Sequence, residues 1–232
     1  MGAMSTPTAS HTSYRRVPEP RWPVALALLA AAAAHFVLPR SLVMGPPWAV
    51  LGVVGILIGC ATFARYKRHW RANETLGYAA LAVLTFALIY GVAALIWALP
   101  RRVEEPAALL RSAAVLWMTN VLVFAGWYWR LDAGGPNARD RRSMHARGAF
   151  LFPQMVLPGA DAATVSDEPG TPNELWRPGF IDYLFLAFNT STAFSPTDVP
   201  VLSRWAKLMM MLQSVISFTS VAVIAARAVN IL

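Results

Sequence analysis

The sequence predicts an all-α, polytopic transmembrane helix bundle. Hydrophobic residues make up 56% of the chain and charged residues only 14%, whereas soluble domains carry about 25% charged residues. Several apolar runs approach or exceed the roughly 20 residues that a helix needs to cross a bilayer. Lys and Arg gather between these runs, as the positive-inside rule expects of membrane proteins. We expect five spanning helices and a re-entrant half-helix.

The first 130 residues are expected to form a tail and a four-helix transmembrane region. Residues 1–20 are rich in Ser, Thr, Pro and Arg and lack an apolar period, which predicts a disordered cytoplasmic tail. Basic residues before the first apolar run are typical of a signal peptide, but more spans follow, so we interpret this run as an uncleaved anchor. Within the region 21–130, the predicted spans are 22–38, 47–64, 76–99 and 107–129.

A polar, proline-rich cytoplasmic linker is expected at 131–178. Its many prolines exclude a long helix. The apolar run 148–157 within it is too short to cross a bilayer, and we expect it to lie along the surface. The region 179–232 then contains a short apolar run at 180–188, a polar turn, and a last predicted span at 203–232.

The distribution of positive charge predicts the orientation of the chain. Basic clusters at 65–71 and 130–147 are separated by two predicted spans, so both can lie on the side of the N-terminal tail. We therefore predict a multi-pass protein of the cell inner membrane with its N-terminus in the cytoplasm. The net charge of +8 suits anionic lipid headgroups, so the lipid bilayer is the expected partner and nucleic acid is not.

The sequence contains no pattern for catalysis or for a cofactor. The single cysteine, Cys60, excludes an internal disulfide and a cysteine metal site. His35 and His69 lack partners at metal-binding spacing, and no His-Glu-x-x-His or Gly-x-Ser-x-Gly motif occurs. We expect no catalytic residues, no metal, no cofactor and no enzyme activity.

The C-terminal segment carries a resemblance to a known family. Phe180-Ile181-Asp182-Tyr183-Leu184-Phe185, followed by Thr190-Ser191-Thr192, resembles the pore helix of the two-transmembrane potassium-channel (pore-loop) family. Asp198-Val199-Pro200 stands where that family has an aspartate after its selectivity filter. The segment is also similar to that of bacterial integral membrane proteins in a family of unknown function. The pore-loop resemblance implies a constriction lined by Thr190, Thr192, Ser195, Thr197 and Asp198.

The filter itself departs from the family pattern. The family has Thr-Val-Gly-Tyr-Gly, where this chain has Ala193-Phe194-Ser195-Pro196-Thr197. Ser195 and Thr197 replace glycines that supply unusual backbone angles, and Pro196 fixes its own φ and restricts Ser195. Potassium selectivity is therefore not expected.

Two classes of function remain. The leading hypothesis is a channel-like or pore-like homo-oligomer, tetrameric if it forms a pore, with monovalent cations as candidate permeants. The alternative is a non-conducting membrane scaffold or accessory protein. A small-molecule transporter ranks lowest, because the sequence shows no internal repeat.

The path of the half-helix is open at this stage. The basic linker places Phe180 on the cytoplasmic side, whereas potassium channels receive their pore helix from outside. Either 180–188 dips in from the cytoplasm and leaves the C-terminus outside, or 176–194 crosses as a sixth span about 28 Å long. Polar residues near both ends of 176–194 favour the re-entrant form.

Polar residues also recur inside the predicted spans. Gln213, Ser217, Ser220 and Arg227 share one face of the last helix. Such a stripe joins helices by hydrogen bonds or faces a bundle interior or water, and we favour the packing role. Asn120, in the middle of the fourth span, needs a partner, for which Gln213 and Ser217 are the candidates.

Overall fold

The computed structural model describes residues 19–98, 105–142, 148–155, 177–192 and 199–231, with side chains in the last segment described as far as Ala226. These residues are mainly helical, and their one β-type contact is an isolated bridge between Phe150 and Val201. The all-α prediction is confirmed. The α-helices are α1 (Trp22–Ala33), α2 (Trp48–Tyr66), α3 (Trp70–Ala98), α4 (Pro106–Leu131), α5 (Pro136–Arg141), α6 (Phe180–Thr192) and α7 (Arg204–Ile231).

Four helices among the described residues are long and apolar enough to cross a bilayer, namely α2, α3, α4 and α7. The first predicted span is shorter than expected. The 12 residues of α1 are extended only by a 3-10 turn at Ala34–Phe36. Pro39 follows closely, and the residue before a proline disfavours helical backbone. The described residues therefore contain four helices of spanning length, where five spans were expected.

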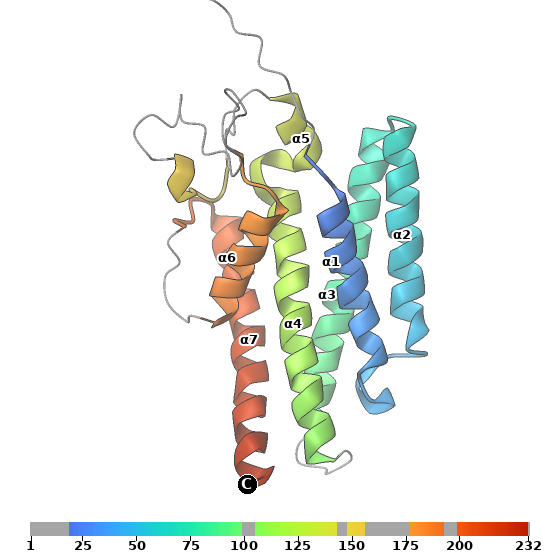
Figure 1. Ribbon diagram of the computed structural model, residues 1–232, viewed down its shortest axis with the longest axis vertical. Helices are drawn as coiled ribbons and strands as arrows, with labels where there is room; N and C mark the ends of the chain where they lie inside the picture. The colour runs from blue at the N-terminus through green and yellow to red at the C-terminus, as the bar shows by residue number, and fades with distance from the viewer. Residues whose placement is uncertain (1–18, 99–104, 143–147, 156–176, 193–198, 232) are drawn as a thin grey trace, which may run out of the picture.

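Helices α1 to α4 stand side by side and alternate in direction, with α6 and α7 packed on α4 (Figure 1). Gly126 of α4 lies where α1, α3 and α4 meet. A Cβ atom at Gly126 would lie 2.8 Å from Leu81 Cδ2 and 3.1 Å from Leu28 Cδ2. The absence of a side chain therefore permits the close approach of these three helices.

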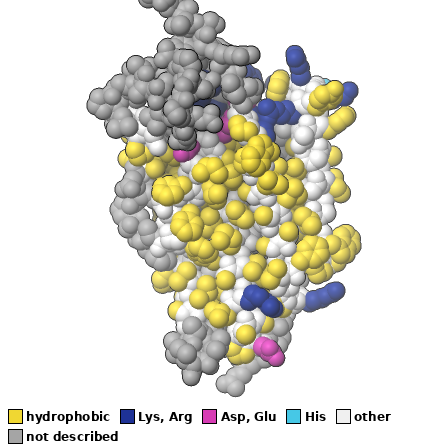
Figure 2. Space-filling model, viewed as in Figure 1, with side chains coloured by type: hydrophobic (Ala, Val, Ile, Leu, Met, Phe, Trp, Pro, Cys, Tyr) yellow, Lys and Arg dark blue, Asp and Glu magenta, His cyan; other side chains and the backbone are white. Residues whose placement is uncertain are grey.

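The outer surface of the bundle is largely apolar. Figure 2 shows hydrophobic side chains over the middle of one face, with Lys and Arg side chains near its two ends. The exposed hydrophobic residues include Ile56 (67%), Phe86 (61%) and Val215 (64%). In α2, the buried residues are only Val54, Ala61 and Ala64. An apolar exterior on helices of spanning length is compatible with an integral membrane protein.

The described residues before and after α6 lie at the same end of the bundle. Helix α6 has 13 residues and is therefore only about 20 Å long. Near its start, Tyr183 stacks edge-on against Phe150, and near its end Ser191 contacts Ser217, midway along α7. Val201 is again beside Phe150. The chain thus enters and leaves the α6 region at the same end of the bundle.

Three residues of the apolar run that begins at residue 148 are buried, namely Ala149, Phe150 and Phe152, although the run was expected to lie along the surface. Phe150 and Phe152 are 1% and 3% exposed. Phe150 packs edge-on against Tyr128 of α4 and Trp205 of α7. These rings fill the space beside α4 and α7 at the end of the bundle where the short helix α6 begins.

Candidate functional site

The C-terminal end of α6 lies inside the bundle. The last four carbonyl groups of any helix have no hydrogen-bond partner within that helix. Side chains of α4 and α7 donate to carbonyls in the last two turns of α6, among which Ser191 O is one of the four without a helical partner. Gln213 Nε2 donates to Ala187 O at 2.7 Å, and Ser217 Oγ donates to Ser191 O at 2.7 Å. Trp117 Nε1 donates to Ser217 Oγ at 2.9 Å and to Ser191 O at 3.5 Å. Neighbouring helices thereby satisfy the Ser191 carbonyl near the end of the half-helix.

Gln213 is the centre of this group of contacts. Its Nε2 also donates to Ser191 Oγ at 2.8 Å, and its Oε1 accepts a hydrogen bond from the Tyr128 hydroxyl. Its backbone carbonyl accepts from Asn120 Nδ2 at 3.1 Å, and Gln213 was one of the two partners that the sequence offered for Asn120. Gln213, Ser191 and Asn120 are fully buried. Three helices, α4, α6 and α7, are therefore joined by buried polar contacts.

The other residues predicted for the site bond within their own helices or lie outside the described residues. The hydroxyls of Thr190 and Thr192 donate to Leu186 O at 2.8 Å and Phe188 O at 3.0 Å, in their own helix α6. Ser220 Oγ donates to Ile216 O at 2.9 Å within α7. The remaining predictions, Ser195, Thr197, Asp198 and the side chain of Arg227, fall outside what the structure describes.

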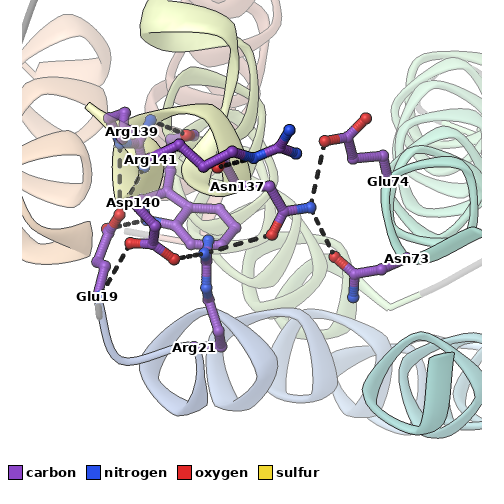
Figure 3. A network of polar contacts seen from close by, with 9 residues as sticks. Glu19, Arg21, Asn73, Glu74, Asn137, Arg139, Asp140 and Arg141 are labelled. Atoms are coloured by element: carbon purple, nitrogen blue, oxygen red, sulfur yellow. Dashed lines mark hydrogen bonds and ion pairs between the residues drawn. The ribbon is translucent and has the colours of Figure 1, made fainter. Parts of the chain in front are cut away.

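A second polar cluster lies at the α5 end of the bundle and was not predicted (Figure 3). Arg139 Nη2 forms an ion pair with Glu19 Oε2 at 2.9 Å, and Arg21 Nη2 forms one with Asp140 Oδ2 at 2.5 Å. Glu19 also accepts a hydrogen bond from the indole N–H of Trp129. The residues that precede α1 are in this way fastened to α4 and α5.

The same cluster reaches α3 through Asn137. The Nδ2 group of Asn137 donates to Asn73 Oδ1 and to Glu74 Oε1, each at 3.2 Å. Burial lowers the pKa of Arg21 to about 10, so its guanidinium remains charged at neutral pH. The Arg21 guanidinium also lies 5.2 Å from the Trp129 ring centroid, in the range of a cation–π contact.

Asp132, fully buried at the end of α4, connects this cluster to the start of α6. Its Oδ2 accepts a hydrogen bond from the Tyr183 hydroxyl at 2.7 Å, and its Oδ1 accepts one from the backbone N–H of Ala149. Arg139 Nη1 donates to the Asp132 carbonyl at 2.9 Å. The carboxylate thereby fixes both α6 and the buried segment at 148–152.

The variant Tyr183→Phe is expected to lower the free energy of unfolding by about 1–2 kcal/mol, because a buried carboxylate loses one of its donors. Thermal unfolding in detergent, followed by circular dichroism, measures the change. Tyr78→Phe is the matched control, since the Tyr78 hydroxyl makes no hydrogen bond among the described residues. An equal effect of both substitutions would show that the Asp132–Tyr183 bond contributes nothing specific.

Neither cluster gathers the side chains that would hold a metal ion, within the part of the chain that the structure describes. Among the described residues, no group of three or more His, Cys, Asp or Glu side chains could hold a metal ion. Sequence reasoning missed Glu19, Asp132, Asn137 and Arg139 because each lies in a segment that it treated as tail or linker. No protein-family model, curated protein or solved structure matches this chain.

Proposed function

We propose that the chain is a non-conducting membrane scaffold in which α6 and α7 form a closed, pore-loop-like unit. The observation that carries this proposal is the capped end of α6. The carbonyl of Ser191 accepts from Ser217 and Trp117, and the carbonyl of Ala187 accepts from Gln213. The proposal involves no catalytic residue, metal or cofactor.

The chemistry of ion conduction explains why this cap matters. A pore-loop filter replaces the hydration shell of an ion with free carbonyl oxygens. In this chain, donors of α4 and α7 already occupy the Ser191 carbonyl, and the polar side chains around it, those of Gln213, Ser217 and Ser191, are 0% exposed. The Ser191 carbonyl is therefore not free to replace the water around an ion.

The second candidate is the pore hypothesis, which one observation favours. The order of a short helix, a return to the same end and a long helix is that of the pore-loop family, and α6 and α7 follow this order. In this alternative, several copies, four if the family arrangement holds, surround an axis. In this hypothesis the residues at 193–198, which include Ser195, Thr197 and Asp198, would line the path of monovalent cations.

The proposed orientation follows from charge at the two ends of the bundle. Arg65, Arg71 and Arg204 begin or end helices at the α5 end, whereas Arg40 and Arg111 lie toward the opposite end. We place the α5 end in the cytoplasm by the positive-inside rule, in a cell inner membrane. If α1 is counted as a fifth span, around which the bilayer is locally thinner, α6 is re-entrant and the C-terminus lies outside.

Reconstitution in liposomes tests the two candidates. For the scaffold, we expect no flux of K⁺ or Na⁺ above that of empty vesicles, and a monomer or dimer by mass measurement in detergent. The pore predicts cation flux and a tetramer. Flux that falls in Asp198→Asn but not in the control Glu105→Gln, which lies outside the α6–α7 unit, would overturn the scaffold proposal and support the pore.

A further inference from the structure

The turn between α2 and α3 is strongly basic and unusually exposed. It carries Arg65, Lys67, Arg68 and Arg71, and residues 63–72 contain no Asp or Glu. Lys67, Arg68 and Arg71 are exposed, and Arg65 is half-buried. No ion pair joins any of these four side chains to a residue that the structure describes. Their positive charge is therefore not neutralised by the described part of the chain.

Arg68 occupies a backbone position that favours glycine. Its φ is +60°, in the left-handed region that L-residues other than Gly, Asn and Asp seldom adopt. This conformation closes α2, because the Arg68 N–H donates to Arg65 O at 2.9 Å and the His69 N–H donates to Ala64 O at 2.8 Å. Glycine is the usual residue at this point of a helix end. An arginine at this position is conformationally unfavourable, and its side chain bonds to no described residue. The two observations together indicate that the Arg68 side chain interacts with a molecule outside the chain.

Aromatic residues flank the basic turn and indicate its depth in a bilayer. Phe63, Tyr66 and Trp70 are 63%, 81% and 41% exposed. Trp22, at the start of the adjacent helix α1, is 66% exposed. Exposed Trp and Tyr residues at the ends of apolar helices lie at the level of lipid headgroups. The four positive side chains of the turn therefore share that level.

We propose that the turn at 65–71 binds the phosphate groups of anionic lipid headgroups. The charges are complementary, and each Lys or Arg near an anionic membrane surface strengthens binding by about fivefold. The flanking rings favour lipid over a soluble acidic partner, because they keep the turn at the headgroup level. This proposal applies to a scaffold and to a pore alike, so its test is independent of the test for conduction.

Native mass spectrometry of the purified, detergent-solubilised full chain provides the test. The probes are phosphatidylglycerol, which is anionic, and phosphatidylcholine, which has the same phosphate but no net charge. The variants are Arg68→Gly alone and the triple variant K67Q/R68G/R71Q. The matched control is R40Q/R111Q, which removes two exposed arginines toward the opposite end of the bundle.

For the wild type, we expect tighter binding of phosphatidylglycerol than of phosphatidylcholine. Arg68→Gly should weaken binding of the anionic lipid about fivefold and the triple variant on the order of a hundredfold. The unfolding temperature of Arg68→Gly should be unchanged or higher, because glycine suits the left-handed position, so lost binding in this variant cannot be ascribed to misfolding.

Three results would overturn the proposal. The first is unchanged affinity for phosphatidylglycerol in Arg68→Gly and in the triple variant. The second is an equal loss of affinity in R40Q/R111Q, which would indicate a general effect of charge. The third is displacement of the lipid by millimolar inorganic phosphate, which would assign the site to a free anion instead of a headgroup.

Discussion

Replacement of Gly135 with alanine is expected to lower the free energy of unfolding by about 3 kcal/mol or more. Gly135 has a φ of +83°, and a Cβ atom there would lie 2.6 Å from the carbonyl oxygen of Arg130. With a ψ of 171°, Gly135 has a backbone conformation that is open essentially to glycine alone and that costs an alanine about 1–3 kcal/mol, and overpacking adds about 1–3 kcal/mol. The obstructing atom belongs to the backbone of α4, so no side-chain rotation relieves the contact.

Gly45 provides a matched control for this substitution. Its φ is +77°, but a Cβ atom there would have no neighbour within 4 Å. Gly45→Ala should therefore cost only the conformational part, about 1–2 kcal/mol. Chemical unfolding in detergent, with circular dichroism as the signal, measures both variants. If the two variants lose the same stability, the close approach of residue 135 to α4 makes no energetic contribution.

The variant Gln213→Leu is expected to lower the free energy of unfolding by about 2–3 kcal/mol. It leaves the Tyr128 hydroxyl without its acceptor and removes the donor to Ala187 O and Ser191 Oγ. An unsatisfied buried polar group costs about 1–3 kcal/mol. Single hydrogen bonds between membrane helices average about 0.6 kcal/mol, so the expected effect depends on the loss of several contacts at once.

Ser220→Ala is the control for Gln213→Leu on the same face of α7. The Ser220 hydroxyl donates only to Ile216 O of its own helix, so its removal should cost less than about 1 kcal/mol. The double variant Y128F/Q213L isolates the pairwise contact between α4 and α7. Additive effects of the two substitutions would argue that Gln213 does not act through Tyr128.

Composition predicted the long helices because a helix surrounded by lipid needs apolar side chains along its length. Apolar runs bounded by charge identify α2, α3, α4 and α7 without knowledge of tertiary contacts. The first span was predicted at 22–38, already slightly short, and its helical turns end at Phe36, shortly before Pro39. The burial of Phe150 depends on Tyr128 and Trp205, which are distant from it in the sequence. The composition near Phe150 does not encode these contacts.

In the candidate sites, too, some contacts could be predicted from the sequence and others could not. The sequence offered Gln213 and Ser217 as partners for Asn120, because a polar residue inside an apolar span must find a partner in a neighbouring helix. The ion pair of Glu19 with Arg139 joins residues separated by 120 positions in the sequence. Both looked like solvated charges in a tail and a linker, and no periodic pattern connects them. The sequence therefore indicates well that a polar residue inside an apolar span has a hydrogen-bond partner. It does not indicate which charged residues of a tail or linker form ion pairs in the folded chain.

The first and last described residues of the chain lie at opposite ends of the bundle, which limits which enzymes can reach each of them. Glu19 is fastened at the α5 end of the bundle, and α7 finishes at the far end (Figure 1). A bilayer around these helices would separate the chain ahead of α1 from the C-terminal end of α7. A protease or kinase confined to one compartment would then reach only one terminus, and reporter domains fused to the two termini would experience different pH and redox conditions.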